Sequence, residues 1–441
     1  MPIDHWMMFG TFAEQRHFVY PTKNTYRGTV INGNMAAHAP EGLAGFVLEK
    51  TANQTYLIDP MTHAFQHDPY FVMDGSGKTR SSIERLAKIY GAPVEKIVGS
   101  RPVRPGDFRD DDILEGFVKR CLEFQSRTIT DAMAQHDARK YLPAIRDENL
   151  KPYAVIAPYF FMMETSLDDW LDVYARALRF SRKHSGDAKL FASVVVSQGV
   201  VLDRGAWGKI VNVIKKGDVS GCLLWVDNLD EQQAGGAELQ GLIELARSLR
   251  NGGAREVINL HGGYFSILAA GILGGSALSG VTHGPEFGEF RSVVPVGGGI
   301  PIARYYIPQL HTRIRYRDAI RVLGAKGWLK NAADFHTNVC DCSECRKTLD
   351  GKSDNFIEFG RDNVRDVRRG SGIVRIGYPT TETKLHCLRH YLQQKAREYQ
   401  FASTGSRELI IADLDKGYAE FEEIVGLDGV GHLRLWKKLL S

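Results

Sequence analysis

The sequence contains no long hydrophobic run and few cysteines. No stretch approaches the roughly 20 apolar residues that cross a bilayer, and the segment Met1 to Phe12 lacks the basic start and apolar run of a signal peptide. Only six cysteines occur in 441 residues, which is typical of a reducing compartment and not of a disulfide framework. These features predict a cytoplasmic protein that does not associate with membranes.

Strong net charge and low-complexity tracts are also missing. The formal charge of +4 and the pI near 8.6 are mildly basic, which permits a nucleic-acid partner without requiring one. The segment Asp74–Thr79 ends in Gly-Lys-Thr, but Val72 stands where a phosphate-binding P-loop needs its first glycine. The 43% of hydrophobic residues are enough for one large domain with insertions, or for two domains.

The densest cluster of chemically active residues is a group of three thiols within six residues: Cys340, Cys342 and Cys345. Thiolates at this spacing suit a structural Zn²⁺ site, which is tetrahedral and takes Cys and His ligands. The fourth ligand could be His386, Cys387 or His390, with His336 a weaker competitor. We favour His390 because it opens a polar, helix-like run. The alternative is that these are ordinary reduced cysteines in a loop.

Apolar, β-branched runs alternate with helical patterns, which is typical of a parallel α/β fold. The helical pattern is clearest in Leu167–His184 and Glu231–Arg250. Eight strands are expected, and this number closes a (β/α)₈ TIM barrel; Gly28–Asn34 is an alternative for the first. The expected strands are Leu43–Leu48, Thr55–Asp59, Tyr153–Pro158, Phe191–Ser197, Gly221–Asp227, Glu256–Leu260, Ala277–Thr282 and Ala303–Ile307.

Three regions are expected along the chain. The barrel occupies residues 1–337 and carries a long insertion over its mouth at about 66–150, which includes a long helix across Asp111–Tyr141. A zinc-binding module at 338–401 follows the last strand. Residues 402–441, with a helix at Arg407–Val425, form a C-terminal helical segment packed on the barrel.

Polar side chains and glycines follow many of the expected strands, at the end of the barrel where chemistry takes place. They are Asp59, Tyr159, Gln198, Gly199, Asp227, His261, Gly262, His283 and Glu286. Any one of them could be a helix cap or a turn residue. Together they form a ring suited to a flat, polar heterocycle, so we predict a binding site there.

The CxCxxC segment with a distant histidine, placed after a long α/β region, resembles the tRNA-guanine transglycosylase superfamily. That superfamily includes the DpdA-type enzymes, which insert 7-deazaguanines into DNA. Asp59–Gln66 resembles the superfamily's D-S-G-G-F-Q motif in its Asp and its Phe-Gln pair, and Val196–Gly199 resembles V-Q-G-G, whose Gln binds the base. The segment that carries the attacking aspartate in the superfamily falls on Gly275–Val281, which contains no carboxylate.

The resemblance implies exchange of guanine in a nucleic acid for a 7-deazaguanine such as preQ0, by displacement at C1′ of a flipped-out nucleotide. DNA is favoured over tRNA as the polymer. We expect Asp59 to be indispensable and Asp227 to attack C1′. Free base and nucleic acid would be partners, with a protein partner or homodimer also possible. The alternative is a catalytically silent relative that binds a base or nucleic acid. A zinc-dependent hydrolase is a third reading, which a fully coordinated zinc ion argues against.

Arginines near the cysteine cluster are candidates for phosphate contacts. Arg365, Arg368 and Arg369 lie in a segment with turn-forming glycines and are the predicted nucleic-acid contacts. A second basic set comprises Arg313, Arg315, Arg317 and Arg321. The alternative for either set is an ordinary solvated surface.

Overall fold

The computed structural model describes residues 2–18, 25–50, 54–135, 151–285, 289–294, 302–369 and 372–441. The chain divides into two compact units. The N-terminal unit ends at Pro295 and the C-terminal unit begins at Val296.

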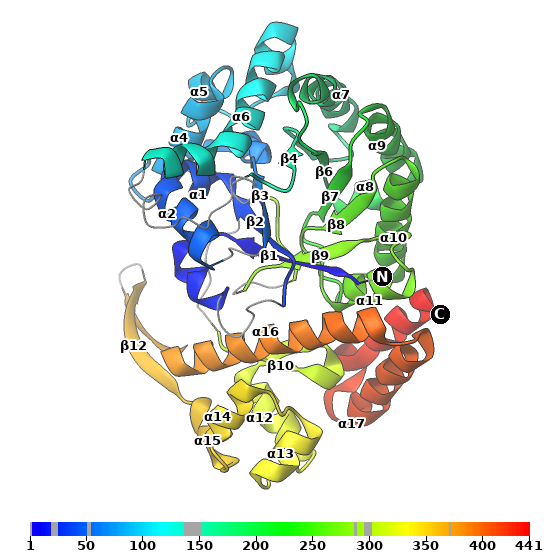
Figure 1. The fold of residues 1–441 in the computed structure, drawn as a ribbon. Coiled ribbons are helices and arrows are strands. Elements are labelled where there is room, and N and C mark those ends of the chain that lie inside the picture. The colour runs from blue at the N-terminus through cyan, green and yellow to red at the C-terminus, as the bar shows by residue number, and fades with distance from the viewer. Residues whose placement is uncertain are drawn as a thin grey trace. The chain divides into compact units, whose positions relative to one another are not determined.

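The N-terminal unit is built on one parallel sheet (Figure 1). Its strands are β1 (Asp4–Phe9), β2 (Gly28–Asn32), β3 (Thr55–Asp59), β4 (Val155–Ile156), β5 (Phe161–Met162), β6 (Leu190–Val196), β7 (Gly221–Val226), β8 (Glu256–Asn259) and β9 (Gly280–His283). Their order is β3-β2-β1-β9-β8-β7-β6-β4, and β4 and β5 pair in turn with β6, so they form one barrel strand. A hydrogen bond from the Tyr153 amide to the Tyr56 carbonyl, 2.8 Å long, joins the two ends. The sheet is thus a nearly closed eight-stranded barrel, and the predicted α/β TIM-barrel fold is confirmed.

The strands are hydrophobic on both faces because helices cover the sheet outside while the barrel is filled inside. Every residue of β2, β6 and β7 is buried. The interior is filled tightly: a Cβ at Gly28 would lie 2.4 Å from the Trp6 ring, and one at Gly221 would lie 2.5 Å from the Phe191 ring. These glycines make room for large aromatic side chains inside the barrel.

Helices of different lengths connect the strands of this unit (Figure 1). They are α1 (Gly33–His38), α2 (Pro40–Gly45), α3 (Pro69–Val72), α4 (Ser81–Tyr90), α5 (Val94–Ile97), α6 (Asp111–Gln135), α7 (Leu167–His184), α8 (Gln198–Leu202), α9 (Arg204–Lys216), α10 (Gly236–Asn251) and α11 (Tyr264–Ile272), with short turns η1 (Phe12–His17), η2 (Phe46–Lys50), η3 (Thr62–Gln66) and η4 (Pro105–Phe108). The long excursion between β3 and β4 contains α3 to α6. The helix predicted over Asp111–Tyr141 is confirmed to Gln135, and its last residues lie outside the described part.

The first predicted strand, Leu43–Leu48, is wrong. It forms the end of α2 and the π-helical turn η2, and its Phe46 ring stacks on Phe9 at a centroid distance of 4.0 Å. The run is apolar because it packs against β1 rather than because it pairs in the sheet. The alternative first strand, Gly28–Asn34, is confirmed as β2, while β1 was not predicted.

The last predicted strand, Ala303–Ile307, is also wrong as a barrel member. Arg304–Ile307 is β10 of the C-terminal unit and pairs antiparallel with β11 (Thr312–Arg315). The predicted number of eight barrel strands is still right, because β2 replaces Leu43–Leu48 and β1 replaces Ala303–Ile307.

The C-terminal unit combines two hairpins with helices. Besides β10 and β11 it contains η7 (Pro308–Leu310), α12 (Tyr316–Ala325), α13 (Ala332–Asn338), α14 (Ser343–Leu349), α15 (Asp354–Phe359), β12 (Asp362–Arg369), β13 (Gly372–Pro379), α16 (Thr381–Thr404) and α17 (Arg407–Leu440). Helix α17 includes the predicted helix Arg407–Val425 and bends at Gly426, where φ is +69°. Its predicted packing on the barrel stays a prediction.

A buried ionic network ties α16 and α17 to the turn between β10 and β11. The Glu398 carboxylate lies 2.7 Å from Lys395 Nζ and 2.8 Å from His311 Nδ1, and His311 Nε2 lies 3.1 Å from Asp413. Lys395, Glu398 and His311 are buried, whereas Asp413 is partly exposed. Removing one of the three buried groups would leave a charge without its partner inside the unit.

None of the helices in the described residues has both the length and the apolar character needed to span a membrane.

Candidate functional site

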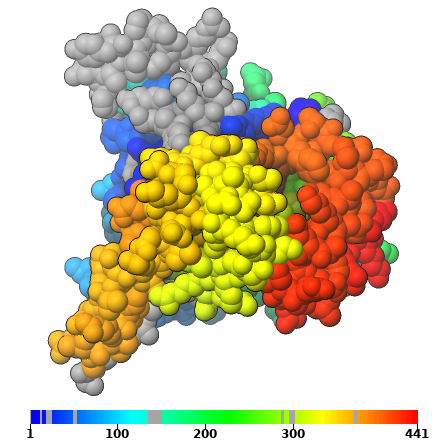
Figure 2. All heavy atoms as spheres, turned by 90° about the horizontal axis from the view of Figure 1, so that it is seen from below, coloured from blue at the N-terminus to red at the C-terminus, as the bar shows by residue number. Residues whose placement is uncertain are grey.

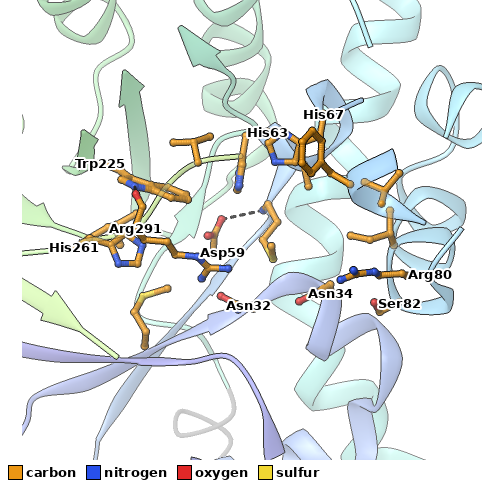
Figure 3. Close-up of a pocket in the computed structure, with 18 residues that line it drawn as sticks. Asn32, Asn34, Asp59, His63, His67, Arg80, Ser82, Trp225, His261 and Arg291 are labelled. Atoms are coloured by element: carbon orange, nitrogen blue, oxygen red, sulfur yellow. Dashed lines mark hydrogen bonds between the residues drawn. The ribbon is translucent and has the colours of Figure 1, made fainter. Parts of the chain in front are cut away.

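A cavity of about 180 Å³ opens at the carboxyl ends of the barrel strands, where barrel enzymes place their chemistry. The lining residues labelled in Figure 3 come from strand ends, from α1, from η3 and α4 with the residues next to them, and from the segment 289–294. They are Asn32, Asn34, Asp59, His63, His67, Arg80, Ser82, Trp225, His261 and Arg291. Asn32 and Asp59 are partners in the β2–β3 register, so their side chains leave neighbouring strands at the same level.

Within the described part of the chain, Asp59 is hydrogen-bonded through one of its two oxygens. Its Oδ1 accepts hydrogen bonds from the Tyr159 hydroxyl at 2.6 Å and from the Met61 amide at 2.9 Å, and Oδ2 takes part in neither bond. Burial raises the pKa of the Asp59 carboxyl, while both hydrogen bonds and the charge of Arg291 act in the opposite direction. The result is an oriented carboxyl group held in a nearly dry place.

A hydrogen-bonded chain runs from Asp59 away from the strand. The Tyr159 hydroxyl lies 2.9 Å from Nδ1 of His63, and the two rings are stacked at a centroid distance of 5.4 Å. Tyr159 and His63 are both buried. Burial and the neighbouring Asp59 raise the pKa of Tyr159 well above its usual range, so its hydroxyl keeps its proton. The chain therefore consists of a carboxyl, a phenol and an imidazole in direct contact.

The histidines around the cavity are neutral at physiological pH. Burial lowers the pKa of His67 to about 4 and that of His261 to about 3. Burial and the nearby His67 and Arg291 lower the pKa of His63 well below its usual range. These imidazoles therefore offer flat faces and hydrogen-bonding nitrogens without charge, and Arg80 and Arg291 are the cations of the lining.

Trp225 and His261 form an aromatic wall of the cavity. Their ring centroids lie 4.8 Å apart, and Trp225 also meets His63 edge to face at 5.2 Å. The Trp225 indole donates a hydrogen bond of 3.1 Å to the Arg291 carbonyl. Aromatic faces beside amide and carboxyl groups are suited to a flat ligand with polar edges.

The predicted site residues do not all meet at this cavity. Asp59 and His261 line it, and Tyr159 lies directly behind Asp59. Asp227 is half-buried at the end of β7 and is not part of the lining; its Oδ1 accepts a 2.6 Å hydrogen bond from the Val293 amide. The Gln198 amide donates to the backbone carbonyls of residues 227 and 228, each at 3.1 Å.

The other predicted substrate-binding residues lie away from the lining. Gly199 lies against the Glu164 carboxylate, and Gly262 is packed on Val281. His283 points to the outer side of the sheet, where its Nε2 lies 2.9 Å from Nε2 of His5. Side chains alternate between the two faces of a strand, so a position next to a strand end does not ensure that its residue faces the cavity. Glu286 lies outside the described residues.

Several lining residues were not predicted. Asn32 ends β2 as Asp59 ends β3, so recognition of β2 as a strand would have found it. His63 lies inside the Asp59–Gln66 segment, two residues before Phe65. Arg291 follows the last barrel strand by eight residues, and no pattern in the sequence identifies it.

The three cysteines and His390 form one buried cluster in the C-terminal unit, with their ligand atoms within 4.8 Å of one another. His390 Nδ1 lies 3.5 Å from the sulfurs of Cys340 and Cys342 and 3.3 Å from that of Cys345. Tetrahedral Zn²⁺ with bonds of about 2.3 Å to sulfur and 2.0–2.1 Å to nitrogen separates these atoms by about 3.6 Å. The cluster can therefore hold a metal ion such as zinc.

The surroundings of the cluster also suit a metal. His390 Nε2 lies 2.7 Å from the Tyr306 carbonyl, so this nitrogen carries the proton and Nδ1 presents its lone pair to the sulfurs. The Gln394 amide donates to the Cys340 sulfur at 3.1 Å. A hydrogen bond donated to a sulfur favours its thiolate, the form in which cysteine binds metals.

The other candidates for the fourth ligand do not reach the cluster. His386 Nδ1 lies 2.8 Å from the Thr348 hydroxyl. Cys387 lies in the next position on α16, is buried apart from the cluster, and has a pKa raised by burial. The His336 ring nitrogen lies 3.0 Å from the Cys340 carbonyl rather than from a sulfur.

No family model and no curated protein matches the sequence of this chain. Among solved structures, it is similar to an intracellular xylanase from Thermoanaerobacterium saccharolyticum, with a TM-score of 0.34 and 9% identity over 66% of this chain and 86% of the xylanase. A GH18 chitinase from Pseudoalteromonas aurantia has a TM-score of 0.33 and 8% identity over 64% of this chain and 93% of the chitinase. Pyruvate carboxylase of Rhizobium etli has a TM-score of 0.31 and 9% identity over 100% of this chain and 36% of the carboxylase.

The predicted nucleic-acid arginines lie on the β12–β13 hairpin, which extends from the rest of the C-terminal unit (Figure 2). Arg365 and Arg368 are exposed, and the Arg365 guanidinium lies 5.8 Å from the centre of the Tyr378 ring. Arg369 ends β12, and its side chain lies outside the described part. The hairpin also exposes Ile373, 74% of whose surface is accessible.

The second basic set is spread over β11 and α12. Arg313 lies over the Tyr391 ring at 4.8 Å, and Arg317 forms a 2.9 Å ion pair with Asp362. Arg315 and Arg321 are exposed.

Proposed function

We propose that this chain is a transglycosylase that exchanges guanine in a nucleic acid, DNA in preference to tRNA, for a 7-deazaguanine such as preQ0. The observation that carries the proposal is Asp59, a carboxyl group that accepts both of its hydrogen bonds at Oδ1, in a cavity of about 180 Å³. A cavity of about 150 Å³ holds a benzene ring, so this cavity has room for a flat ring of the kind that a base presents.

The cavity walls support recognition of a purine-like ring. Trp225 and His261 offer faces for stacking. The Asn32 carboxamide, beside Asp59, offers both a donor and an acceptor to the polar edge of the base. A stacked base cannot enter such a cavity, so the nucleotide would be flipped out of its helix.

In the proposed reaction Asp59 attacks C1′, in place of the Asp227 expected from the sequence. Oδ2 forms a bond to C1′ as the bond from C1′ to the guanine nitrogen breaks. The incoming 7-deazaguanine then attacks C1′ from the same cavity and releases Asp59. Asp227 is the weaker candidate because its Oδ1 is already bonded to the Val293 amide and it does not line the cavity.

The cysteine cluster has a structural role in this proposal. Cys340, Cys342, Cys345 and His390 would hold Zn²⁺ with no coordination position open to substrate. The bound ion would join α16 to the segment before α14. Arg365, Arg368 and Arg369 on the hairpin would contact phosphates of the polymer, a contact that positions the nucleic acid without reading its sequence.

A specific observation favours a second candidate function, binding of a base without catalysis. Asp59 is the one carboxylate among the described residues that line the cavity, whereas base exchange needs both a nucleophile and a group that transfers a proton. A protein that only binds nucleic acid or a modified base would need no second group.

Incubation with labelled guanine or preQ0 and duplex DNA or tRNA, followed by measurement of label in the polymer, tests the exchange. We expect Asp59→Asn to abolish incorporation and Asp227→Asn to retain it. Substrate trapping should give a covalent adduct on the peptide that contains Asp59. Incorporation that survives in Asp59→Asn, or an adduct on Asp227, would contradict the assignment. Binding of the base with no incorporation by the wild type would establish the second candidate.

A further inference from the structure

We infer that Asp59, Tyr159 and His63 form a proton relay that carries the Asp59 proton to the leaving base while Asp59 attacks C1′. The inference rests on the proposed exchange reaction. That reaction needs a group that transfers a proton besides the attacking carboxylate, and the inference assigns this role to His63. Its basis is the continuous hydrogen-bonded chain from Asp59 Oδ1 through the Tyr159 hydroxyl to His63 Nδ1, with links of 2.6 and 2.9 Å.

The chain has two proton arrangements, because a phenol donates one hydrogen bond and accepts another. When Asp59 is ionised, Tyr159 donates to Asp59, and His63 donates its Nδ1 proton to Tyr159. When Asp59 is protonated, it donates to Tyr159, and Tyr159 donates to His63 Nδ1. The imidazole proton then lies on Nε2. The tautomer of His63 therefore reports the charge of Asp59.

The second arrangement is the reactive one. As Asp59 Oδ2 bonds to C1′, its carboxyl proton moves to Tyr159, the Tyr159 proton moves to His63 Nδ1, and the His63 Nε2 proton moves to the departing guanine nitrogen. One bond from C1′ to nitrogen breaks and one from C1′ to oxygen forms. Every group of the relay ends uncharged, and guanine leaves as the neutral base. The incoming base reverses each transfer when it loses its ring proton to His63.

The position of His63 permits this role. It lies on η3, four residues after Asp59, and its ring is part of the cavity lining. The lowered pKa of His63 and the raised pKa of Asp59 both favour the uncharged forms that the relay uses. Tyr159 is a positioning residue that transmits the proton.

Other charged and titratable groups surround the relay. The charge of Arg291 lowers the pKa of all three members of the relay. His67 and His261 also lower the pKa of His63, and Tyr90 of α4 raises the pKa of Tyr159. The histidines are neutral for the reasons given above, and burial keeps the Tyr90 phenol protonated. Arg291 is therefore the one fixed charge among these groups, and it limits how far the pKa of Asp59 rises.

The relay predicts the direction of the pH dependence of exchange. The wild-type rate should fall as pH rises through the pKa of Asp59, because the proton to be delivered is lost. In Tyr159→Phe the hydrogen-bonded relay is broken, so Asp59 attacks as the anion. The exchange rate of this variant should be lower than that of the wild type by about 10²-fold or more. It should rise over the same pH range, because the fraction of ionised Asp59 rises. His63→Ala should lose a similar factor and regain rate with added imidazole.

Tyr174→Phe is the matched control, because Tyr174 is also a buried tyrosine whose hydroxyl is bonded, at 2.8 Å to the Ser193 carbonyl on the outer side of the barrel. It should keep the wild-type pH profile. A Tyr159→Phe profile that falls like that of the wild type would overturn the relay. So would full activity in His63→Ala, or a loss of activity in a folded His63→Ala that imidazole does not restore.

A nitrogen NMR titration of histidine-labelled protein tests the relay without any exchange. We expect the His63 proton to move from Nδ1 to Nε2 as the pH falls through the Asp59 titration in the wild type. Asp59→Asn should keep it on Nδ1 throughout. If the wild type incorporates no base but shows this change, the proposed function fails, and proton transfer along Asp59, Tyr159 and His63 is the part that remains. A fixed His63 tautomer in an active wild type would refute the relay alone.

Discussion

Glu231 allows a quantitative test of how a buried carboxylate affects the stability of the barrel. It is 4% exposed and accepts hydrogen bonds from the Ser266 hydroxyl at 2.5 Å and the Ser266 amide at 3.1 Å, at the start of α11. Burial, with a smaller contribution from Glu289, raises the pKa of Glu231 from 4.5 to about 7. Glu231→Gln removes the ionisation and keeps the shape of the side chain.

The sign follows from proton binding in the two states. Between about pH 4.5 and pH 7 the folded protein keeps a proton on Glu231 that the unfolded chain has lost. The free energy of unfolding contributed by this group therefore falls as pH rises through that window, and the loss is complete above pH 7. The full change amounts to about 3 kcal/mol, since one pKa unit corresponds to about 1.4 kcal/mol.

Other buried groups titrate in the same range with the opposite sign. His261 and His67 bind protons more readily in the unfolded chain, so they lower stability as pH falls below their unfolded pKa values. The wild-type curve therefore mixes both effects. The difference between the wild type and Glu231→Gln cancels the histidine contribution, because both proteins contain the same histidines.

The measurement is urea unfolding, monitored by circular dichroism, at several pH values between 5 and 8. We expect the stability of Glu231→Gln relative to the wild type to improve by about 3 kcal/mol across this range. Glu244→Gln is the control, because Glu244 pairs with Arg204 on the surface and its pKa is lowered. A stability difference for Glu231→Gln that does not change with pH would refute the reasoning.

Three further predictions concern the metal, the hairpin and the cavity. Cys340→Ser should contain no zinc by elemental analysis and should unfold around the cluster, because metal binding and local folding are coupled. The control Cys387→Ser should keep one zinc per chain, and a Cys340→Ser protein with one zinc per chain would exclude this site. Replacing Arg365 and Arg368 together by Ala should weaken nucleic-acid binding and reduce the salt dependence by roughly one unit of slope per lost contact, and an unchanged slope would assign both to ordinary solvated surface. Asp59→Asn should raise the melting temperature relative to the wild type by an amount that grows as pH rises, because the amide cannot become a buried charge and its oxygen still accepts the two hydrogen bonds; a difference that does not change with pH would contradict the raised pKa.

The sequence by itself predicted the features that depend on local pattern. The strands β3, β6, β7 and β8 are short apolar runs between turn signals, and their burial on both faces makes the pattern continuous. The thiol cluster was equally visible, because a CxCxxC spacing places three sulfurs together in any compact turn. Asp59 was found because a carboxylate that ends such a strand lies at the carboxyl end of the barrel.

Only the tertiary structure decided which segments complete the barrel and which side chains meet. Leu43–Leu48 and β1 are both apolar, but only β1 pairs in the sheet. Leu43–Leu48 forms a helix end and a turn that pack against β1. Of the candidates on α16, His390 joins the cysteine cluster, whereas His386, one turn earlier on the same face, lies against the Thr348 hydroxyl. Tyr159 reaches Asp59 and His63 across about a hundred residues of chain. Such contacts arise from strand order and closure of the sheet, which no local pattern encodes.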